Sequence, residues 1–310
     1  MNILVTGGAG YIGSVLTNFL TKLDYNVTVL DNFFFKQEHI KSSLLRNNIN
    51  IIQGDVRDEK LLFDVVKKND VIIPLACLVG APLCDLYPDE AIQVNQKSIN
   101  NLTNMLSKQQ IVIFPVSNSG YGVGKKNELC TETSNLNPIS LYGKTKVYAE
   151  EMIMSRENSI ALRLATVFGM SPRMRVDLLV NNFVYQSLLT KHLKIFEGNF
   201  KRNYVHIEDV VNVFIFMITN FSKYKNNVFN FGLEEANLSK LELANKIQTY
   251  IKDLIIQESE FDKDPDKRDY IVSNKKILST GFKFKKSLDD GIIELISGLL
   301  DKKTVISKNV

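Results

Sequence analysis

The stretch "TGGAGYIG" (residues 6–13) follows a short apolar run and opens an amphipathic segment. It places Gly7, Gly10 and Gly13 three residues apart. Between a strand and a helix, the first glycine permits a tight turn, the second lets the backbone approach a pyrophosphate, and the third lets the helix pack on the strand. The helix N-terminus then faces the phosphates with unpaired N–H groups. The motif therefore predicts a dinucleotide site, which Tyr11 and Ile12 help to line.

The sequence around this motif has the alternating strand and helix patterns of an α/β protein. Short runs rich in Ile and Val, apolar on both faces as buried parallel strands are, alternate with amphipathic segments of helical length. This alternation predicts a Rossmann-type doubly wound parallel sheet. We expect strands at 2–7, 27–31, 49–55, 70–76, 111–117 and 160–169, with crossover helices over 88–108 and 140–157.

Beyond residue 170 the alternation is less regular. Ser239 and Glu242 have the spacing of a capping box, and "SLDDGIIELISGLL" (287–300) begins in a similar way. We expect helices at 177–190 and 208–220, strands at 194–197, 203–207 and 228–232, and two further helices after residues 239 and 287. We predict that residues 1–169 form the cofactor-binding domain, that 203–232 returns to it, and that 170–202 and 233–310 form a smaller substrate-binding region.

Composition restricts the class of protein. The 310 residues are 45% hydrophobic and 23% charged, with a net charge of +4, as in ordinary soluble proteins that do not bind nucleic acid. The three cysteines and three histidines lack metal-ligand spacing, so we expect no metal site, and we interpret Cys77 and Cys84 as packing residues. No apolar window approaches the roughly 18 residues of a membrane span. We expect a cytoplasmic protein with a solvated basic tail, "DKKTVISKNV" (301–310).

Two acidic residues at strand ends bear on the choice of dinucleotide. Asp31 ends the second predicted strand, where a carboxylate accepts from the ribose hydroxyls and repels a 2′-phosphate, so NAD is favoured over NADP. Asn32 follows it, and no arginine stands there to hold a phosphate. Asp55, followed by Val56, is placed to reach the adenine amino group. The alternatives are that Asp31 caps a turn and that Asp55 supplies charge to the next helix.

A second group of residues, Ser117, Tyr142 and Lys146, provides candidate catalytic side chains. Tyr142 and Lys146 in "YGKTK" share one face of a predicted helix, and an ammonium beside oxidised nicotinamide stabilises phenolate over phenol. Ser117 closes the strand "IVIFPVS", at the carboxyl edge of the sheet, where ligands bind. Together with the glycine motif, these residues predict hydride chemistry.

These motifs resemble those of the extended short-chain dehydrogenases/reductases, the NAD-dependent nucleotide-sugar epimerases, dehydratases and dehydrogenases. The resemblance rests on "TGGAGYIG", "LDN", "GDVRD", "VSNSGYG", "LYGKTK", "KRNYVHIEDVV" and "LSTGFKFKKSLDDGI". It implies a catalytic triad of Ser117, Tyr142 and Lys146, supported by Asn95, and a homodimer built on helices 88–108 and 140–157. It also implies that Leu75 and Ala76 bind the cofactor and that Thr166 binds the substrate. The chain departs from the family pattern at these places, with "PLAC" instead of His-Leu-Ala-Ala and Thr166 instead of an asparagine.

The same resemblance assigns the substrate side. Asn181, Asn182, Arg202 and Arg268 fall where family members hold the diphosphate of a nucleotide sugar, although each arginine is also consistent with a surface ion pair. Two segments, "LVGAPLCDLYP" (78–88) and "MSPRMRVDLLV" (170–180), resemble the C4 dehydrogenases of bacterial capsule pathways that act on GDP-linked manno-heptose. In the second segment, Arg173 and Arg175 face the sugar, a phosphate or the solvent.

The residues after Ser117 restrict the reaction. A 4,6-dehydratase needs an acid and a base there, commonly Asp–Glu, whereas this chain has Asn118 and Ser119, neither of which carries a proton near neutral pH. We expect both to contact the substrate without driving dehydration. Oxidation at C4 by NAD remains, with two outcomes open: release of the 4-keto sugar, or return of the hydride by a 4-epimerase. A third hypothesis is a catalytically idle dinucleotide sensor, against which the intact Ser117, Tyr142 and Lys146 argue. The resemblance favours the dehydrogenase.

Overall fold

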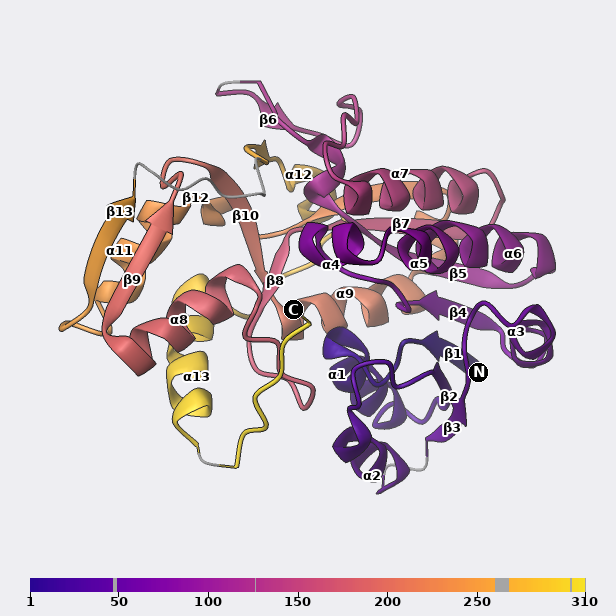
Figure 1. Ribbon diagram of the computed structural model, residues 1–310. Helices are drawn as coiled ribbons and strands as arrows, with labels where there is room; N and C mark the ends of the chain where they lie inside the picture. The colour runs from indigo at the N-terminus through magenta and orange to yellow at the C-terminus, as the bar shows by residue number, and fades with distance from the viewer. Residues whose placement is uncertain (47–48, 126, 260–267, 302, 310) are drawn as a thin grey trace.

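A parallel sheet of seven strands forms the centre of the computed structural model, which describes residues 1–46, 49–125, 127–259, 268–301 and 303–309 (Figure 1). The strand order is β11-β7-β5-β4-β1-β2-β3. The order reverses between β1 and β4, which creates a crevice at the carboxyl ends of the strands. In chain order the strands are β1 (Asn2–Thr6), β2 (Asn26–Asp31), β3 (Asn50–Gln53), β4 (Val71–Pro74), β5 (Ile111–Ser117), β7 (Ser159–Leu164) and β11 (Asn227–Phe231).

Helices cover both faces of this sheet. Successive strand residues point to opposite faces, so Ile3 and Val5 share one core with α1 (Tyr11–Thr21), α2 (Glu38–Arg46) and α9 (Ile207–Thr219). Leu4 lies in a second core with α3 (Glu59–Val66), α6 (Ser98–Met105) and α7 (Leu141–Met154). Burial on both sides explains why the strands are continuously apolar. The predicted doubly wound fold is confirmed.

The predicted strand over 160–169 is wrong in one respect, because it is two strands. β7 ends at Leu164, and β8 (Thr166–Phe168) leaves the central sheet to pair with β10 (Lys201–His206), which also pairs with β12 (Asn237–Ser239). Partners distant in the sequence set this division. It moves the chain after Ala165 away from the central sheet and into the other half of the molecule.

The predicted helix over 88–108 is also interrupted. It consists of α5 (Pro88–Ile92), a π-helical turn at Gln93–Lys97, and α6, which ends at Met105. Inside the π-turn, the Asn95 carboxamide accepts from Leu78 N at 2.9 Å and donates to Thr145 Oγ1 at 3.2 Å. The turn therefore ties the segment after β4, which leads to α4 (Ala81–Leu86), to α7.

Most of the remaining elements form a smaller region beside the sheet with a core of its own (Figure 1). Ser239 and Ser287 make the predicted capping boxes, with Glu242 and Asp290. The elements are α8 (Leu179–Thr190), β9 (His192–Phe196), α11 (Lys240–Gln248), β13 (Ile255–Ser259) and α13 (Leu288–Leu300). Two short helices, α10 (Phe221–Tyr224) and α12 (Lys275–Leu278), pack on the core of the central sheet, and the short strands β6 (Leu129–Cys130) and β14 (Ile271–Val272) pair with each other around a small separate cluster.

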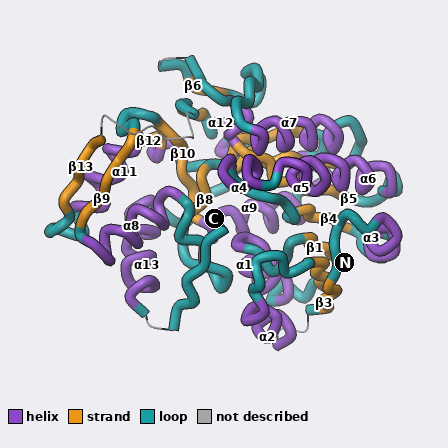
Figure 2. The backbone as a smooth tube through the Cα atoms, viewed as in Figure 1, coloured by secondary structure: helices purple, strands orange, loops and turns teal. Residues whose placement is uncertain are grey.

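The segment after α13 is solvated, as expected, but its backbone is attached to the rest of the molecule. As Figure 2 shows, it is a loop that runs back from α13 towards β8. Ser307 O accepts from Val176 N at 2.9 Å, and Asn309 N donates to Asp177 Oδ1 at 3.3 Å. The side chains of Lys303 and Lys308 are exposed, so these backbone contacts have no signal in the basic composition of the segment. Within the described residues, no helix combines the length and apolarity required to cross a membrane.

Candidate active site

The glycine motif forms the turn between β1 and α1 that its spacing predicts. Gly7 has a φ of +70°, and a Cβ there would lie 2.6 Å from Ala76 N. A Cβ on Gly13 would lie 2.4 Å from Gly7 O. Gly10 is the N-cap of α1, and its N–H donates to Gly7 O at 3.0 Å. Side chains are thus excluded from the turn, which leaves backbone N–H groups at the helix N-terminus available to phosphate.

Asp31 lies beside this turn at the end of β2. Its Oδ2 accepts from Ala9 N at 3.0 Å and its Oδ1 from Phe33 N at 2.8 Å. Burial raises the pKa of this carboxyl, while the two backbone N–H groups and the charge of Arg173 act in the opposite direction. Asp31 therefore braces the glycine turn and also lines the cavity described below.

Asp55 belongs to a polar group next to Asp31. Arg57 donates to both Asp55 carboxylate oxygens, at 2.9 and 2.7 Å, and Asn32 Nδ2 donates to Asp55 Oδ2 at 2.9 Å. The bonds from Arg57 lower the pKa of Asp55 to about 2. The N-cap of α3 is Asp58, so Asp55 does not cap that helix. Sequence reasoning missed Arg57, which also lines the cavity.

Ser117, Tyr142 and Lys146 come together at the carboxyl edge of the sheet. Ser117 ends β5, and α7 brings Tyr142 and Lys146 to the same cavity. Burial raises the pKa of Tyr142, whereas Arg268 and a side-chain hydrogen bond with Ser117 act against that rise. Burial lowers the pKa of Lys146, whose Nζ lies 4.2 Å from the centroid of the Phe114 ring.

Two thiols lie close to these three residues. Cys77 and Cys84 both donate to Leu78 O, at 3.4 and 3.2 Å. Burial raises the pKa of each thiol, to about 12 for Cys84. Both therefore remain protonated at neutral pH and are poor nucleophiles.

The residues after Ser117 do not reach the cavity wall. Asn118 and Ser119 begin a 3₁₀ turn and are 1% and 0% exposed. Ser119 N donates to Ser117 Oγ at 3.1 Å, which holds that hydroxyl in place. Neither side chain lines the cavity, so their expected contact with the substrate is not seen.

The predicted substrate residues divide between the cavity and the core. Thr166, Asn182, Arg202 and Arg268 line the cavity, whereas Asn181 does not. Asn181 accepts from Gly169 N at 3.0 Å and donates to Tyr11 Oη at 3.2 Å and Arg175 O at 2.9 Å.

Arg202 is buried, so a surface ion pair does not describe it. It is 2% exposed, its Nη1 donates to the backbone oxygens of Lys201 and Arg268, and its guanidinium lies 5.6 Å from the Tyr270 ring. Lys240 and Tyr270 line the same end of the cavity. Sequence reasoning missed both, because nothing near them in the chain marks them.

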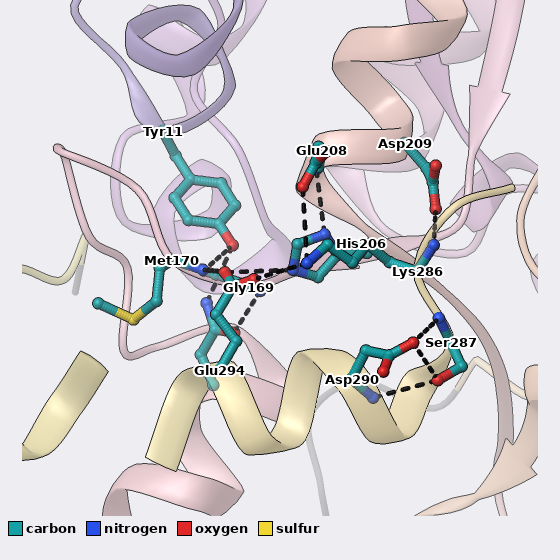
Figure 3. A network of polar contacts seen from close by, with 11 residues as sticks. Tyr11, Gly169, Met170, His206, Glu208, Asp209, Lys286, Ser287, Asp290 and Glu294 are labelled. Carbon is teal, nitrogen blue, oxygen red and sulfur yellow. Dashed lines mark hydrogen bonds and ion pairs between the residues drawn. The ribbon is translucent and has the colours of Figure 1, made fainter. Parts of the chain in front are cut away.

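A polar network positions the loop between β8 and α8 (Figure 3). Tyr11 Oη donates to Gly169 O at 2.8 Å, which links α1 to this loop. Glu294 of α13 accepts from Met170 N at 3.1 Å, and the same carboxylate lies 3.3 Å from Nε2 of His206 at the start of α9. The loop is thus attached to both halves of the molecule.

The glycine turn, the Asp31 and Asp55 groups, the cluster of Ser117, Tyr142 and Lys146, and Arg202 line one cavity of about 480 Å³. It extends from the glycine turn, past Ser117, to Arg202. The predicted residues that line it are Gly7, Gly10, Tyr11, Ile12, Gly13, Asp31, Asn32, Asp55, Val56, Leu75, Ala76, Ser117, Tyr142, Lys146, Thr166, Asn182, Arg202 and Arg268.

Comparison with known proteins identifies the family. Residues 3–232 match the NAD dependent epimerase/dehydratase family. The chain belongs to this family. NAD, the predicted cofactor, is therefore the cofactor of this epimerase/dehydratase family member, and the predicted Rossmann-type fold is that of the family.

The relatives of this family member catalyse different reactions. A UDP-glucose 4-epimerase of Lactobacillus helveticus is 29% identical over 280 residues, covering 80% of this chain and 82% of its own. A UDP-glucuronic acid decarboxylase 4 of Arabidopsis thaliana is 29% identical over 306 residues, covering 94% and 67%. The UDP-glucuronic acid 4-epimerase of Bacillus cereus, solved with UDP-glucuronic acid and NAD, superposes with a TM-score of 0.83 at 25% identity, covering 96% of this chain and 99% of its own.

Proposed function

We propose that this enzyme oxidises a nucleotide-linked sugar at C4 with NAD and releases the 4-keto sugar. The supporting observation is that Ser117, Tyr142 and Lys146 meet in the cavity that contains the glycine turn and Asp31. A Cβ at Gly7 or Gly13 would collide with backbone, so the turn requires glycine there, and the N-terminus of α1 that follows it is suited to a pyrophosphate. Bound NAD supplies the hydride acceptor.

Tyr142 acts as the base in this proposal. Burial holds its pKa above the ordinary value, so the phenolate needs positive charge nearby. Lys146, one helical turn away and buried, supplies such a charge, and oxidised nicotinamide adds another. Tyr142 takes the proton from the C4 hydroxyl, while Ser117 donates a hydrogen bond to the developing ketone oxygen.

Dehydration is disfavoured by the surroundings of Ser117. The positions that carry an acid and a base in a dehydratase are Asn118 and Ser119, and both lie outside the cavity lining. Four acidic residues line it among those that the structure describes. Asp31 accepts from two backbone N–H groups, Asp55 is paired with Arg57 and Asp177 with Arg175, and Glu90 lies close enough to Arg57 for its charge to act there. This pairing disfavours proton transfer at C5 and C6 by the described carboxylates.

For the substrate, we propose a nucleotide diphosphate sugar, GDP-linked manno-heptose in a surface-polysaccharide pathway. The segments that suggest it, 78–88 and 170–180, both contribute to the cavity wall, and Arg202 and Arg268 supply cationic groups for a diphosphate. We also propose that the enzyme works in the cytoplasm as a homodimer through α5–α6 and α7.

A 4-epimerase is the second candidate, supported by the reactions of the named epimerase relatives. The test is incubation of the protein and NAD with GDP-manno-heptose and, in parallel, UDP-glucose, followed by mass detection. A product lighter by two hydrogens, with NADH formed in equal amount, supports the dehydrogenase. A product of unchanged mass with an inverted C4 supports the epimerase, and loss of water contradicts both.

A further inference from the structure

Arg173 has a position that the proposed reaction does not use. It lies on the loop between β8 and α8, is 2% exposed and lines the cavity. Its guanidinium lies 4.6 Å from the centroid of the Phe35 ring, and Phe35 follows β2 on the cofactor side. A residue from the loop that leads to α8 thus reaches the dinucleotide half of the cavity.

The hydrogen-bonding edge of Arg173 is unsatisfied. Nε and Nη2 are buried and have no partner among the described residues. Arg57 and Arg175 also line the cavity. In each of them Nε and Nη2 donate hydrogen bonds to an aspartate, which is Asp55 for Arg57 and Asp177 for Arg175. Burial lowers the pKa of Arg173 to about 10, which leaves it charged at neutral pH. A buried cation with an open fork fits two oxygens of an anion.

The surroundings of Arg173 indicate which anion this is. Asp31 is close enough for its charge to act on Arg173, yet both Asp31 oxygens accept from backbone N–H groups of the β2–glycine turn region. Asp31 also lies next to the glycine turn, where the N-terminus of α1 favours negative charge. The residues proposed to hold the sugar nucleotide, Arg202 and Arg268, contact each other in a separate cluster with Tyr270.

We propose that Arg173 binds a phosphate of the dinucleotide, so that the β8–α8 loop helps to retain the cofactor. This inference rests on the proposed use of the cavity as the NAD site. The phosphate belongs to the pyrophosphate, which NAD and NADP share and whose oxygens fit the two N–H donors of the guanidinium. Arg173 contacts this phosphate from the β8–α8 loop, in addition to the contacts from the glycine turn.

The test compares Arg173→Met, which keeps a long stem on Phe35 but removes the fork, with wild type in titrations of NAD, NADP, ADP and adenosine. We expect Arg173→Met to weaken NAD and ADP about 10- to 100-fold, as loss of a charge-assisted phosphate contact does, and to leave adenosine within about twofold. Arg173→Lys should recover part of the loss. NAD and NADP should lose affinity equally, and a loss confined to NADP would contradict the assignment to the pyrophosphate.

The control is Arg156→Met, which removes an arginine that does not line the cavity and that donates to Ser107 O and Gln110 O. NAD affinity should change by less than about threefold in this variant even if the melting temperature falls. Equal weakening of adenosine by Arg173→Met, or unchanged NAD affinity with a raised KM for the sugar nucleotide, would overturn the inference. Failure of the wild type to bind NAD would instead overturn the proposed function, and the inference with it.

Discussion

At the scale of single residues, Asp31 bears on the choice between NAD and NADP. It accepts a hydrogen bond from Ala9 N of the glycine turn and lines the cavity. The charge of Arg173 lowers the pKa of Asp31 and so favours its ionised form, which repels a 2′-phosphate. NAD should therefore bind much more tightly than NADP.

Replacing Asp31 with Asn keeps the shape and removes the charge. The ratio of NADP to NAD dissociation constants should fall roughly tenfold or more, because repulsion of a 2′-phosphate within a few ångströms disappears. Titration of both cofactors against wild type and variant measures it. Comparable affinity of the wild type for the two cofactors would show that Asp31 does not discriminate.

Tyr142 and Ser117 should be separable by their kinetic effects. Tyr142→Phe should abolish hydride transfer and leave NAD binding intact, because it removes the base without opening the glycine turn. Ser117→Ala should slow turnover by roughly two to three orders of magnitude, as loss of a partner for a developing oxyanion does. Single-turnover formation of NADH, with NAD titration as the control, checks both. Substantial NADH formation by Tyr142→Phe would assign the base elsewhere.

At the scale of elements, the β8–α8 loop depends on attachments from several directions. Tyr11 of α1 and Glu294 of α13 hold its first residues (Figure 3). Asn181 of α8 accepts from Gly169 N, and the C-terminal segment holds the end of the loop through Val176 N. The loop carries Arg173, Arg175 and Asp177 into the cavity wall. Its conformation is therefore a property of four elements rather than of its own sequence.

Asp177→Ala should loosen this loop. It removes the partner of the Arg175 guanidinium and the acceptor of Asn309 N–H, and breaking such a nearly buried pair costs about 3 kcal/mol. The melting temperature should fall and the KM for the sugar nucleotide should rise. The control Asp253→Ala breaks the exposed pair with Lys191, where less than about 1 kcal/mol is at stake. Equal melting temperatures for the two variants would contradict this account of the loop.

At the scale of the whole molecule, one cavity runs between the central sheet and the smaller region. The glycine turn and Asp31 line the sheet side, and Arg202 of β10 lines the other. Cofactor and substrate affinities should therefore respond to different substitutions, and hydride transfer should need both halves.

Arg202→Ala tests this separation. The KM for the sugar nucleotide should rise about 10- to 100-fold, since a charge-assisted phosphate contact is lost, while the NAD dissociation constant stays within about twofold. Because Arg202 also holds the Arg268 carbonyl, thermal melting must accompany the kinetics. A KM within about twofold of wild type would remove Arg202 from the substrate site.

The sequence by itself determined the features that depend on neighbours along the chain. The glycine spacing, the apolar strands, the capping boxes and the placement of Ser117, Tyr142 and Lys146 on a strand end and one helix face follow from local periodicity. Tertiary structure alone decided the rest. Asn181 and Asn182 are about 100° apart on α8, and only the packing of that helix puts Asn181 in the core and Asn182 at the cavity. Asn118, Ser119, Arg173 and the C-terminal segment were likewise placed by contacts with residues distant in sequence, which no local pattern encodes.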